Sequence, residues 1–380
     1  MKIVFASDTF KGTLTATEIG EIGEEVVKKV FGRCNVEKIP MADGGEGTVD
    51  CLIEAMCGER VTCTVQDPLG REIQAEYGRF GECAIIEMSS ASGITLVEES
   101  ERNIFKQTTY GTGQLILHAL ENGANHIYIG IGGSATNDGG LGFAEAIGVI
   151  FLDKENNRLD ATPENFEKID EINTGMINPL IQTAEITVMC DVTNPLLGLE
   201  GATYVFGKQK GATEQTIPIL EKGMEHYINL AEAVTNKQVR YDKGAGAAGG
   251  LGAALKLFTN AKMCSGIDTV LNILDFNNKI YDADLVITGE GRMDYQSAYG
   301  KVASGVAKVC KEQNIPCVAV VGGMGERANE MLELGIRAIV PIVDTPMPLS
   351  QALKNARPLY KDALERTLSL IKIGMEYLPK

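Results

Sequence analysis

Apolar and polar positions alternate along both ends of this 380-residue chain in a way that predicts strands followed by helices. Residues 2–6 form a short apolar run typical of a buried strand, and residues 15–30 carry apolar side chains at helical spacing behind a capping-box pair. From about residue 281 the alternation returns, with strands predicted at 284–288 and 317–321. Strands that alternate with helices favour a parallel, doubly wound sheet.

The middle of the chain shows a different pattern. Residues 61–90 alternate between apolar and polar positions on either side of turn sequences, which predicts an antiparallel meander. Apolar residues aligned over 353–371 predict one closing helix. We therefore expect an α/β protein of two domains. The first is a discontinuous doubly wound domain of residues 1–60 plus 281–380, and the second is an inserted α/β domain of residues 61–280 with antiparallel elements.

Composition and charge argue against several classes of protein. The chain has 35 basic and 51 acidic residues and a net charge of −16, which disfavours nucleic acid and anionic membranes as partners. Its nine cysteines are scattered and include no Cys-x-x-Cys pair, which argues for reduced thiols and against a disulfide framework or a zinc site. Without a visible signal peptide or a run of about 18 apolar residues, we expect a cytoplasmic protein with no transmembrane helix.

Glycine is enriched, and much of the excess lies in a few charged loops. The chain has 43 glycines, against a usual share of roughly 7 %. Most of these loops follow a predicted strand and open a helix, and their glycines let backbone N–H groups approach a phosphate. We expect all five at the same edge of one parallel sheet. They are Asp8–Gly12, Asp43–Gly47, Gly132–Gly140, Asp191–Pro195 and Gly289–Asp294.

The charged residues of these loops suit phosphoryl transfer. That reaction needs carboxylates to hold Mg²⁺ and to orient the attacking hydroxyl, and cations to stabilise the moving phosphoryl group. Lys11, Arg292 and Lys301 are the candidate cations. Some of the acidic and amide residues, Asn137 and Asp138 among them, could instead cap helices. The candidate carboxylates are Asp8, Asp43, Glu46, Asp138, Asp191, Glu290 and Asp294.

A further glycine-rich segment, Gly244–Gly249, could indicate a different function. Gly244–Gly249 matches Gly-x-Gly-x-x-Gly, the dinucleotide fingerprint, so a dinucleotide-dependent oxidoreductase is one alternative function. Its context is poor, because residues 238–242 would make only a weak, polar strand before it. We favour an Ala/Gly-rich helix start that packs tightly against a nucleotide or another part of the protein. The P-loop and the Gly-x-Ser-x-Gly motif are both missing from the sequence.

Taken together and in order, these motifs resemble the bacterial glycerate kinase family, of the type I, glycerate 2-kinase-like kind. Proline is expected where Lys208 stands and often where Ala303 stands, and both departures are details of a loop or a helix start. The resemblance implies two α/β domains, one flavodoxin-like, with the active site in the cleft between them. It also implies ATP, Mg²⁺ and transfer of the γ-phosphate to D-glycerate. The segments that carry it are 8–14, 42–48, 130–140, 190–198, 206–212, 244–252 and 288–301.

Within this resemblance the role of each residue is a hypothesis. We expect Asp191, which follows a predicted strand, to be the general base, with Asp294 as the fallback and Lys11 and Arg292 as catalytic cations. Asp191 could instead form a turn with Thr193 or bind Mg²⁺, and Mg²⁺ is assigned to Asp43, Asp191 or Asp294. A non-catalytic nucleotide or sugar-acid sensor is a further alternative. The residues expected to bind substrate or phosphate are Asp8, Lys11, Gly12, Asp43, Gly44, Gly45, Ser134, Asn137, Asp138, Asn194, Gly289, Glu290, Gly291 and Lys301.

Overall fold

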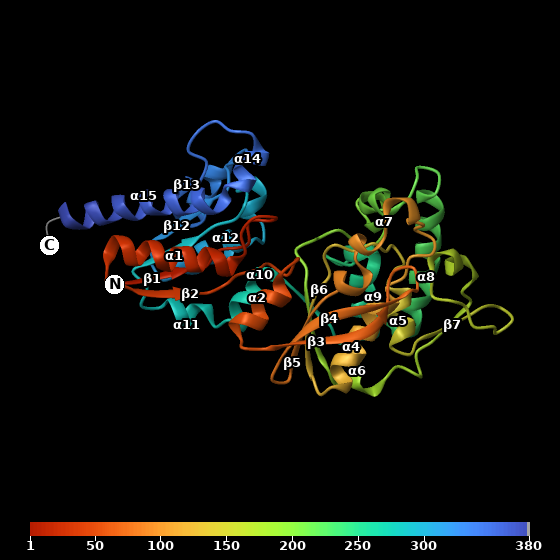
Figure 1. The fold of residues 1–380 in the computed structure, drawn as a ribbon. Helices are drawn as coiled ribbons and strands as arrows, with labels where there is room; N and C mark the ends of the chain where they lie inside the picture. Colours follow the sequence, from red (N-terminus) through yellow and green to blue (C-terminus); the bar gives the residue numbers. More distant parts are fainter. Residues whose placement is uncertain (378–380) are drawn as a thin grey trace. The chain divides into compact units, whose positions relative to one another are not determined.

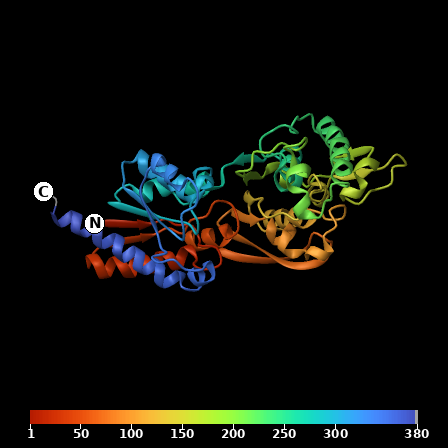
Figure 2. The ribbon, with the colours of Figure 1, turned by 90° about the horizontal axis from the view of Figure 1, so that it is seen from above.

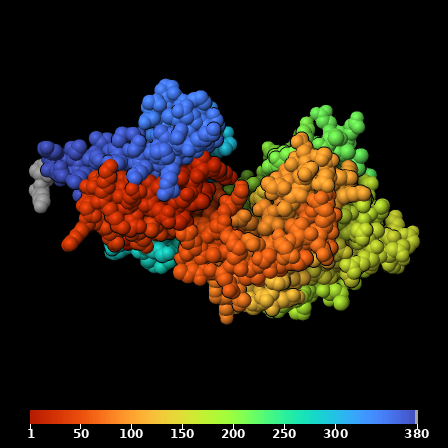
Figure 3. Space-filling view, in the orientation of Figure 1, coloured from red at the N-terminus to blue at the C-terminus, as the bar shows by residue number. Residues whose placement is uncertain are grey.

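The computed structural model describes residues 1–377, and contacts divide the chain into two compact units. The first unit contains Met1–Asp43, Glu54–Met56 and the chain from Gly266 onward, and the second contains Gly44–Ile53 and Cys57–Ser265. The first unit is therefore formed by the two ends of the chain, which are red at one end and teal to blue at the other in the space-filling view (Figure 3). The domain limits placed at residues 60 and 280 stay a prediction.

A five-stranded parallel sheet forms the centre of the first unit (Figure 1). Its order is β13-β12-β11-β1-β2, with Ile3 of β1 between Leu285 of β11 and Val36 of β2. Counted along the chain this order is 2-1-3-4-5, the flavodoxin arrangement, whose switch point lies between β1 and β11. The predicted doubly wound parallel sheet is confirmed. The strands are β1 (Lys2–Phe5), β2 (Asn35–Lys38), β11 (Leu285–Thr288), β12 (Cys317–Val321) and β13 (Ile336–Pro341).

Helices cover both faces of this sheet, because crossovers between parallel strands are right-handed. The step from β1 to β2 and the step from β11 to β12 run in opposite directions, so α1 (Ala16–Phe31) and α12 (Val302–Glu312) lie on opposite faces. Next to α1 lies α15 (Ala356–Tyr377), as Figures 1 and 2 show, and ion pairs such as Lys29–Glu365 join the two helices. The other helices of this unit are α10 (Gly266–Ile273), α11 (Phe276–Ile280), α13 (Met331–Leu334) and α14 (Leu349–Lys354), with the 3₁₀ turns η6 (Tyr295–Ala298) and η7 (Ala328–Glu330).

Local sequence signals explain where two of these helices begin. The capping box predicted before α1 is present, since Thr15 accepts a hydrogen bond from the N–H of Glu18 and the Glu18 side chain bonds back. The single closing helix predicted over 353–371 is wrong. The chain breaks at Asn355 between α14 and α15, because Pro358 has no N–H to donate and is tolerated only in a first helical turn.

The second unit is built on a six-stranded mixed sheet of order β10-β9-β6-β5-β4-β3. Strands β3, β4 and β5 pair antiparallel, which confirms the meander predicted over 61–90, and the pairs from β5 to β10 are parallel. A small sheet joins β7 and β8. The strands are β3 (Glu59–Gln66), β4 (Glu72–Phe80), β5 (Cys83–Glu87), β6 (His126–Gly130), β7 (Ile150–Leu152), β8 (Glu171–Asn173), β9 (Glu185–Met189) and β10 (Lys262–Cys264).

A large apolar core in the second unit joins the sheet to the helices packed on it, and a small separate cluster is formed by Ile104, Ala212, Ile217 and Leu220. Ile127 and Ile129 of β6 and Val188 of β9 are fully buried in the large core with Phe143 and Tyr227. The helices are α2 (Thr48–Ala55), which continues into Glu54–Met56 of the first unit, α3 (Ser89–Ser92), α4 (Tyr110–Glu121), α5 (Leu141–Ala146), α6 (Pro179–Thr183), α7 (Ala202–Phe206), α8 (Ile217–Thr235) and α9 (Leu251–Phe258). The 3₁₀ turns are η1 (Ile94–Leu96), η2 (Glu99–Glu101), η3 (Pro163–Lys168), η4 (Lys208–Lys210) and η5 (Ala247–Gly250).

Within residues 1–377, no helix combines the length and the apolar character that crossing a membrane requires.

Candidate active site

Two glycine-rich loops meet at the switch point of the first unit's sheet. The loop after β1 carries Asp8, and the loop after β11 carries Gly289. The N–H of Asp8 donates to the carbonyl of Gly289 at 2.9 Å. A Cβ on Gly289 would lie 1.9 Å from the Val320 carbonyl, and one on Gly291 would lie 3.5 Å from the Cα of Phe10. Glycine at 289 is therefore a steric requirement, because the backbones approach too closely for a side chain there.

Three carboxylates gather at this edge of the sheet. Burial, the charge of Asp43 and the charge of Glu290 raise the pKa of Asp8 to about 7, while the N–H of Thr9 and the charge of Lys11 oppose the shift. Burial also raises the pKa of Glu290, whose side chain is 7 % exposed. Its Oε1 is buried and has no hydrogen-bond partner. Carboxylates crowded in this way are destabilised as anions unless a cation joins them.

Cationic side chains lie along the same loops. Lys301, at the N-cap of α12, places its Nζ 3.7 Å from Oε2 of Glu290. The side chain of Arg292 is 74 % exposed, and its Nε lies 3.6 Å from Oδ2 of Asp294. Lys11 is exposed, and Gly12 beside it has φ 75°, a conformation that favours glycine. The structure thus brings Asp8, Asp43, Glu290 and three candidate cations to one sheet edge.

Asp294 is engaged in local structure. Its carboxylate accepts a hydrogen bond from the N–H of Gln296 at 3.0 Å, and its own N–H donates to Ser297, so that it caps η6. Together with the Arg292 pair, these bonds give Asp294 a structural task at the start of a 3₁₀ turn.

A third loop at this edge was missed by the sequence reasoning. Residues 322–327 follow β12, and their backbone is hydrogen-bonded to the β11 loop through Gly322 to Glu290 and Met293 to Gly323. Further on, Arg327 lies over the Tyr295 ring, 5.8 Å from its centroid. The signal was available, because three glycines between 322 and 325 follow a buried strand as in the other loops.

In the second unit, the loop after β6 holds Ser134, Asn137 and Asp138. Asp138 is fully buried and accepts hydrogen bonds from the N–H and hydroxyl of Thr109, at 2.8 and 2.7 Å, and from the N–H groups of Gly140 and Gly142. Burial raises the pKa of Asp138, and these hydrogen bonds counteract the shift. The carboxylate therefore joins its own loop to the residue that precedes α4.

Beside Asp138, Asn137 is also fully buried. Its Nδ2 donates to Oγ1 of Thr203 at 3.1 Å, and its Oδ1 has no hydrogen-bond partner.

A buried lysine beneath this loop was also missed. Lys210 is 2 % exposed and donates to Oγ of Ser134 and to the carbonyl of Thr136, both at 2.7 Å. Burial lowers its pKa to about 7, although the charge of Asp138 acts in the opposite direction. The sequence offered little to separate it from Lys208, two positions earlier in the same segment, whose side chain is 62 % exposed and pairs with Glu214.

The remaining predicted residues lie at two places in the second unit. Asp191 follows β9, as predicted, and is exposed. Asn194 donates from its Nδ2 to the carbonyl of Glu200 at 2.7 Å. Gly44, with φ 87°, is buried, and its carbonyl lies 2.2 Å from where a Cβ on Gly130 would be. The carbonyl of Gly45 accepts from Thr48.

The expectation that all five loops share one sheet edge is wrong. The loops that contain Asp8, Asp43 and Glu290 follow β1, β2 and β11 of the first unit, whereas those of Ser134 and Asp191 follow β6 and β9 of the second. Parallel strands bring their carboxyl ends to one edge only within a single sheet. The sequence does not show that these strands belong to two different sheets.

The dinucleotide fingerprint is used for packing. A Cβ on Gly246 would lie 2.1 Å from the Pro195 carbonyl, and one on Gly249 would lie 2.0 Å from the Thr136 carbonyl. The nearest strand before it in the described chain is β9, so the strand–loop–helix context of a dinucleotide site is missing. These glycines let the start of α9 pack against the Ser134 loop.

Two further findings concern ligands. Among residues 1–377, no group of three or more His, Cys, Asp or Glu side chains is arranged to hold a metal ion.

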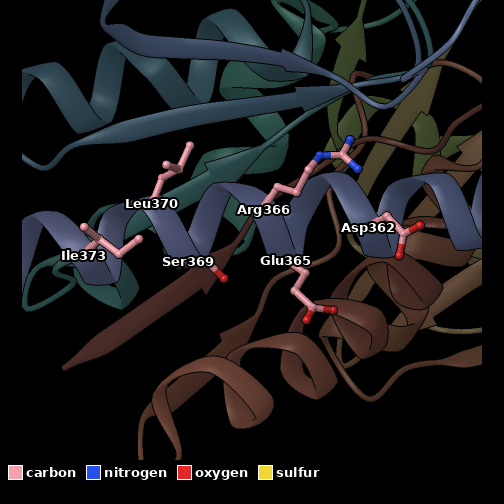
Figure 4. A pocket seen from close by; sticks show the side chains of 6 residues that line it. All are labelled: Asp362, Glu365, Arg366, Ser369, Leu370 and Ile373. Atoms are coloured by element: carbon pink, nitrogen blue, oxygen red, sulfur yellow. The ribbon is translucent and has the colours of Figure 1, made fainter.

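A surface hollow on α15 is lined by Glu365, Arg366, Leu370 and their helix neighbours (Figure 4). Glu365 in its lining pairs with Lys29, which lies near the C-terminal end of α1. That is the edge opposite to the loops, since α1 runs back along the sheet.

The fold and the loop chemistry define a class: an α/β enzyme of two compact units with loops suited to phosphoryl transfer. The profile of the glycerate kinase family matches residues 3–372. The chain belongs to this family, and so to the kinases that transfer a phosphoryl group to an alcohol.

Relatives and a solved structure agree with this assignment. The chain is 43 % identical over 363 residues to a glycerate kinase of Halalkalibacterium halodurans, covering 95 % of this chain and 96 % of that one. It is 39 % identical to the glycerate 2-kinase of Escherichia coli, covering 99 % of each. The crystal structure of a Salmonella typhimurium LT2 protein assigned as glycerate kinase 2 matches with a TM-score of 0.91 and 40 % identity, covering 99 % of both chains.

Proposed function

We propose that this protein transfers the γ-phosphate of ATP to D-glycerate, at the 2-hydroxyl, and forms 2-phosphoglycerate. The observation that carries the proposal is the group of Asp8, Asp43 and Glu290 at the switch point of a flavodoxin-like sheet, with Lys11 and Lys301 beside it. Ligands of such sheets bind at this place. Family membership and the name of the Escherichia coli relative support the substrate and the product.

In this proposal the first unit binds the phosphates. Lys11 and Lys301 attract the phosphate oxygens, and Arg292 offers parallel N–H donors that suit a phosphate or a carboxylate. A Cβ would meet nothing within 4 Å at Gly12 and nothing closer than 3.5 Å at Gly291, so a phosphate can approach the backbone of these two residues. Because positioning and charge stabilisation supply most of the catalysis in phosphoryl transfer, these contacts account for the role of the loops.

Mg²⁺ fits the donors at this edge. The unpartnered Oε1 of Glu290 and the raised pKa of Asp8 are both relieved when a cation lies among these oxygens. Mg²⁺ usually takes one or two carboxylates together with phosphate oxygens and water, so it needs no ready-made group of three side chains. One or two of Asp8, Asp43 and Glu290 would hold it together with phosphate oxygens and water, and it would neutralise phosphate charge there. Asp191 and Asp294 are the alternative ligands.

Asp191 is the proposed general base. It accepts the proton of the substrate hydroxyl while that oxygen bonds to the γ-phosphorus and the bond to ADP breaks. Asp294 is the weaker choice, because its carboxylate caps η6 and pairs with Arg292. For Asp138 and Asn137 we propose a supporting role, since both are buried beneath the loop of Ser134.

The test is a turnover assay with resolved products. Purified protein is incubated with ATP, Mg²⁺ and D-glycerate while ADP release is followed, and ³¹P NMR identifies the phosphorylated carbon. D-lactate, which lacks the 3-hydroxyl, and L-glycerate are the matched controls. Glycerate-dependent ADP release with a 2-phospho product supports the proposal. ATP binding without turnover would favour a sensor, and a change in NAD(P)H absorbance would favour an oxidoreductase.

We also propose a cytoplasmic location, with glycerate and ATP as small-molecule partners and with neither nucleic acid nor a membrane as a partner. All nine cysteines are free thiols, as expected where the surroundings are reducing. The net charge of −16 opposes binding to nucleic acid.

A further inference from the structure

Lys210 lies beneath the loop of Ser134 without a carboxylate in direct contact. Its Nζ has three N–H donors, and the two hydrogen bonds found for it go to neutral oxygens, the Ser134 hydroxyl and the Thr136 carbonyl. Asp138 acts on it only as a neighbouring charge. Burying an ammonium group without a paired anion is costly. A neutral side chain would fill the same space at a lower cost, so packing alone does not explain a lysine here.

The loop above Lys210 is held from below by a second side chain. Gln107 is fully buried, and its Nε2 donates to the carbonyls of Ala135 and Lys210. Three buried acceptors around this point have no hydrogen-bond partner: Oε1 of Gln107, Oγ1 of Thr136 and Oδ1 of Asn137. The underside of the loop is thus a buried polar layer that contains the Lys210 amine and three acceptors without hydrogen-bond partners.

The bond to Ser134 has a direction that matters. Because Lys210 donates to the Ser134 oxygen, the hydroxyl hydrogen of Ser134 points elsewhere and can be donated to another group. A hydroxyl that accepts a bond from a cation is polarised and becomes a stronger donor. Ser134 is 8 % exposed, and the two residues before it, Gly132 and Gly133, are exposed. A Cβ on Gly132 would meet nothing within 4 Å, so a ligand oxygen can approach the loop here.

We propose that Lys210 is a positioning residue that acts through Ser134, and that the polarised Ser134 hydroxyl donates to an anionic oxygen of a substrate. This inference rests on the proposed function, because it takes the Ser134 loop as part of the substrate site. The ligand chemistry is a carboxylate or phosphate oxygen. The two sources are D-glycerate and ATP, and separate Michaelis constants distinguish them.

The experiment compares Lys210→Met, Ser134→Ala and the double variant. A lost hydrogen bond to an anionic group raises the KM for one of the two substrates by about 10- to 100-fold, while the KM for the other stays within about twofold. The double variant loses no more than Ser134→Ala alone, because one residue acts through the other. Additive losses, or equal changes in both Michaelis constants, would overturn the inference.

Lys237→Met is the matched control. Lys237 is also partly buried with a lowered pKa, but it donates to the carbonyls of Lys256, Leu257 and Thr259 at the end of α9. This control loses thermal stability and keeps both Michaelis constants. If Lys210→Met behaves in the same way, Lys210 is structural only.

A binding measurement covers two further cases. The rise in melting temperature on adding D-glycerate alone, or ATP alone, is recorded for the wild type and for Ser134→Ala, which keeps Lys210 and is expected to fold. Loss of one ligand's effect in Ser134→Ala supports the inference even where Lys210→Met does not fold or the wild type shows no turnover. An inactive wild type refutes the proposed function alone. Unchanged shifts for both ligands refute the role of Ser134, and with it that of Lys210.

Discussion

Replacing Asp8 with asparagine should stabilise the protein while it damages activity. The carboxylate lies at the switch point, where burial and the charges of Asp43 and Glu290 raise its pKa from 3.8 to about 7. In the unfolded chain the ordinary pKa applies, so between pH 4 and 7 the native state binds more protons than the unfolded state. Stability therefore falls as the pH rises through this window, and the full cost is present above pH 7.

The size of this cost follows from the shift. Three pKa units correspond to roughly 4 kcal/mol at 1.36 kcal/mol each. Asp8 is partly exposed, and water screens its charge, so we take about half of this value, ~2 kcal/mol. Asparagine keeps the shape and can still accept from the N–H of Thr9, but it carries no charge. For a folding unit of 150–250 residues, 1 kcal/mol moves the melting temperature by about 2–4 °C, so Asp8→Asn should melt roughly 4–8 °C higher at pH 8.

Thermal melts at pH 4.5 and pH 8 check this prediction. The difference between Asp8→Asn and the wild type should be clear at pH 8 and fall to about a quarter of that size at pH 4.5, where the carboxyl of the folded wild type is also neutral. Glu24→Gln is the control of opposite sign, since Glu24 pairs with Lys28 and Lys38 and its pKa is lowered to about 2. That change should not stabilise the protein at pH 8. A variant that is no more stable than the wild type at pH 8, or a gain equal at both pH values, would refute the reasoning.

The other site residues give three further predictions. Lys11→Met should lower kcat/KM by about 100-fold or more with little change in melting temperature, and a near-normal rate would rule out a phosphate contact. Arg292→Lys keeps the charge but loses the forked donors, so the KM of one substrate should rise; unchanged kinetics would make Arg292 only the ion-pair partner of Asp294. Asp191→Asn should reduce kcat by about 1000-fold, or ~4 kcal/mol, and a Mg²⁺ titration separates base from ligand. If Asp191→Asn retains a tenth of the activity or more, Asp191 is neither base nor ligand and only forms a turn with Thr193.

The parallel sheet could be predicted because its strands are short, apolar and separated by helical patterns. The run at residues 2–6 and those at 284–288 and 317–321 became β1, β11 and β12. What the pattern could not supply was the assignment of strands to sheets. Hydrophobic periodicity shows which face of a segment is buried, but not which neighbour covers it. For that reason the Asp191 loop was placed at the same edge as the Asp8 loop, although their strands belong to different sheets.

Side-chain environments were harder to predict than elements. The glycine-rich loops identified Asp8 and Asp138 equally well, since both follow a strand and adjoin a glycine-rich turn. The structure separates them: the charge of Asp8 is opposed by neighbouring acids, whereas Asp138 is held by four hydrogen bonds from its own unit. Whether a carboxylate faces a ligand or the interior depends on contacts between distant segments, such as Thr109 with Asp138, and a local motif does not encode these.

The environments of Lys210 and Lys237 differ in the same way. Lys210 is buried and Lys237 partly buried, both have lowered pKa values, and their hydrogen-bond partners distinguish their roles. Lys237 donates to three carbonyls at the end of α9, where a positive charge offsets the helix dipole. Its burial therefore stabilises the end of this helix. Lys210 bonds to a serine hydroxyl and one loop carbonyl, neither of which repays the burial of an ammonium group. We assign Lys210 a role in the reaction for two reasons. No structural contact compensates for the cost of burying it, and it lies next to a loop that reaches the surface.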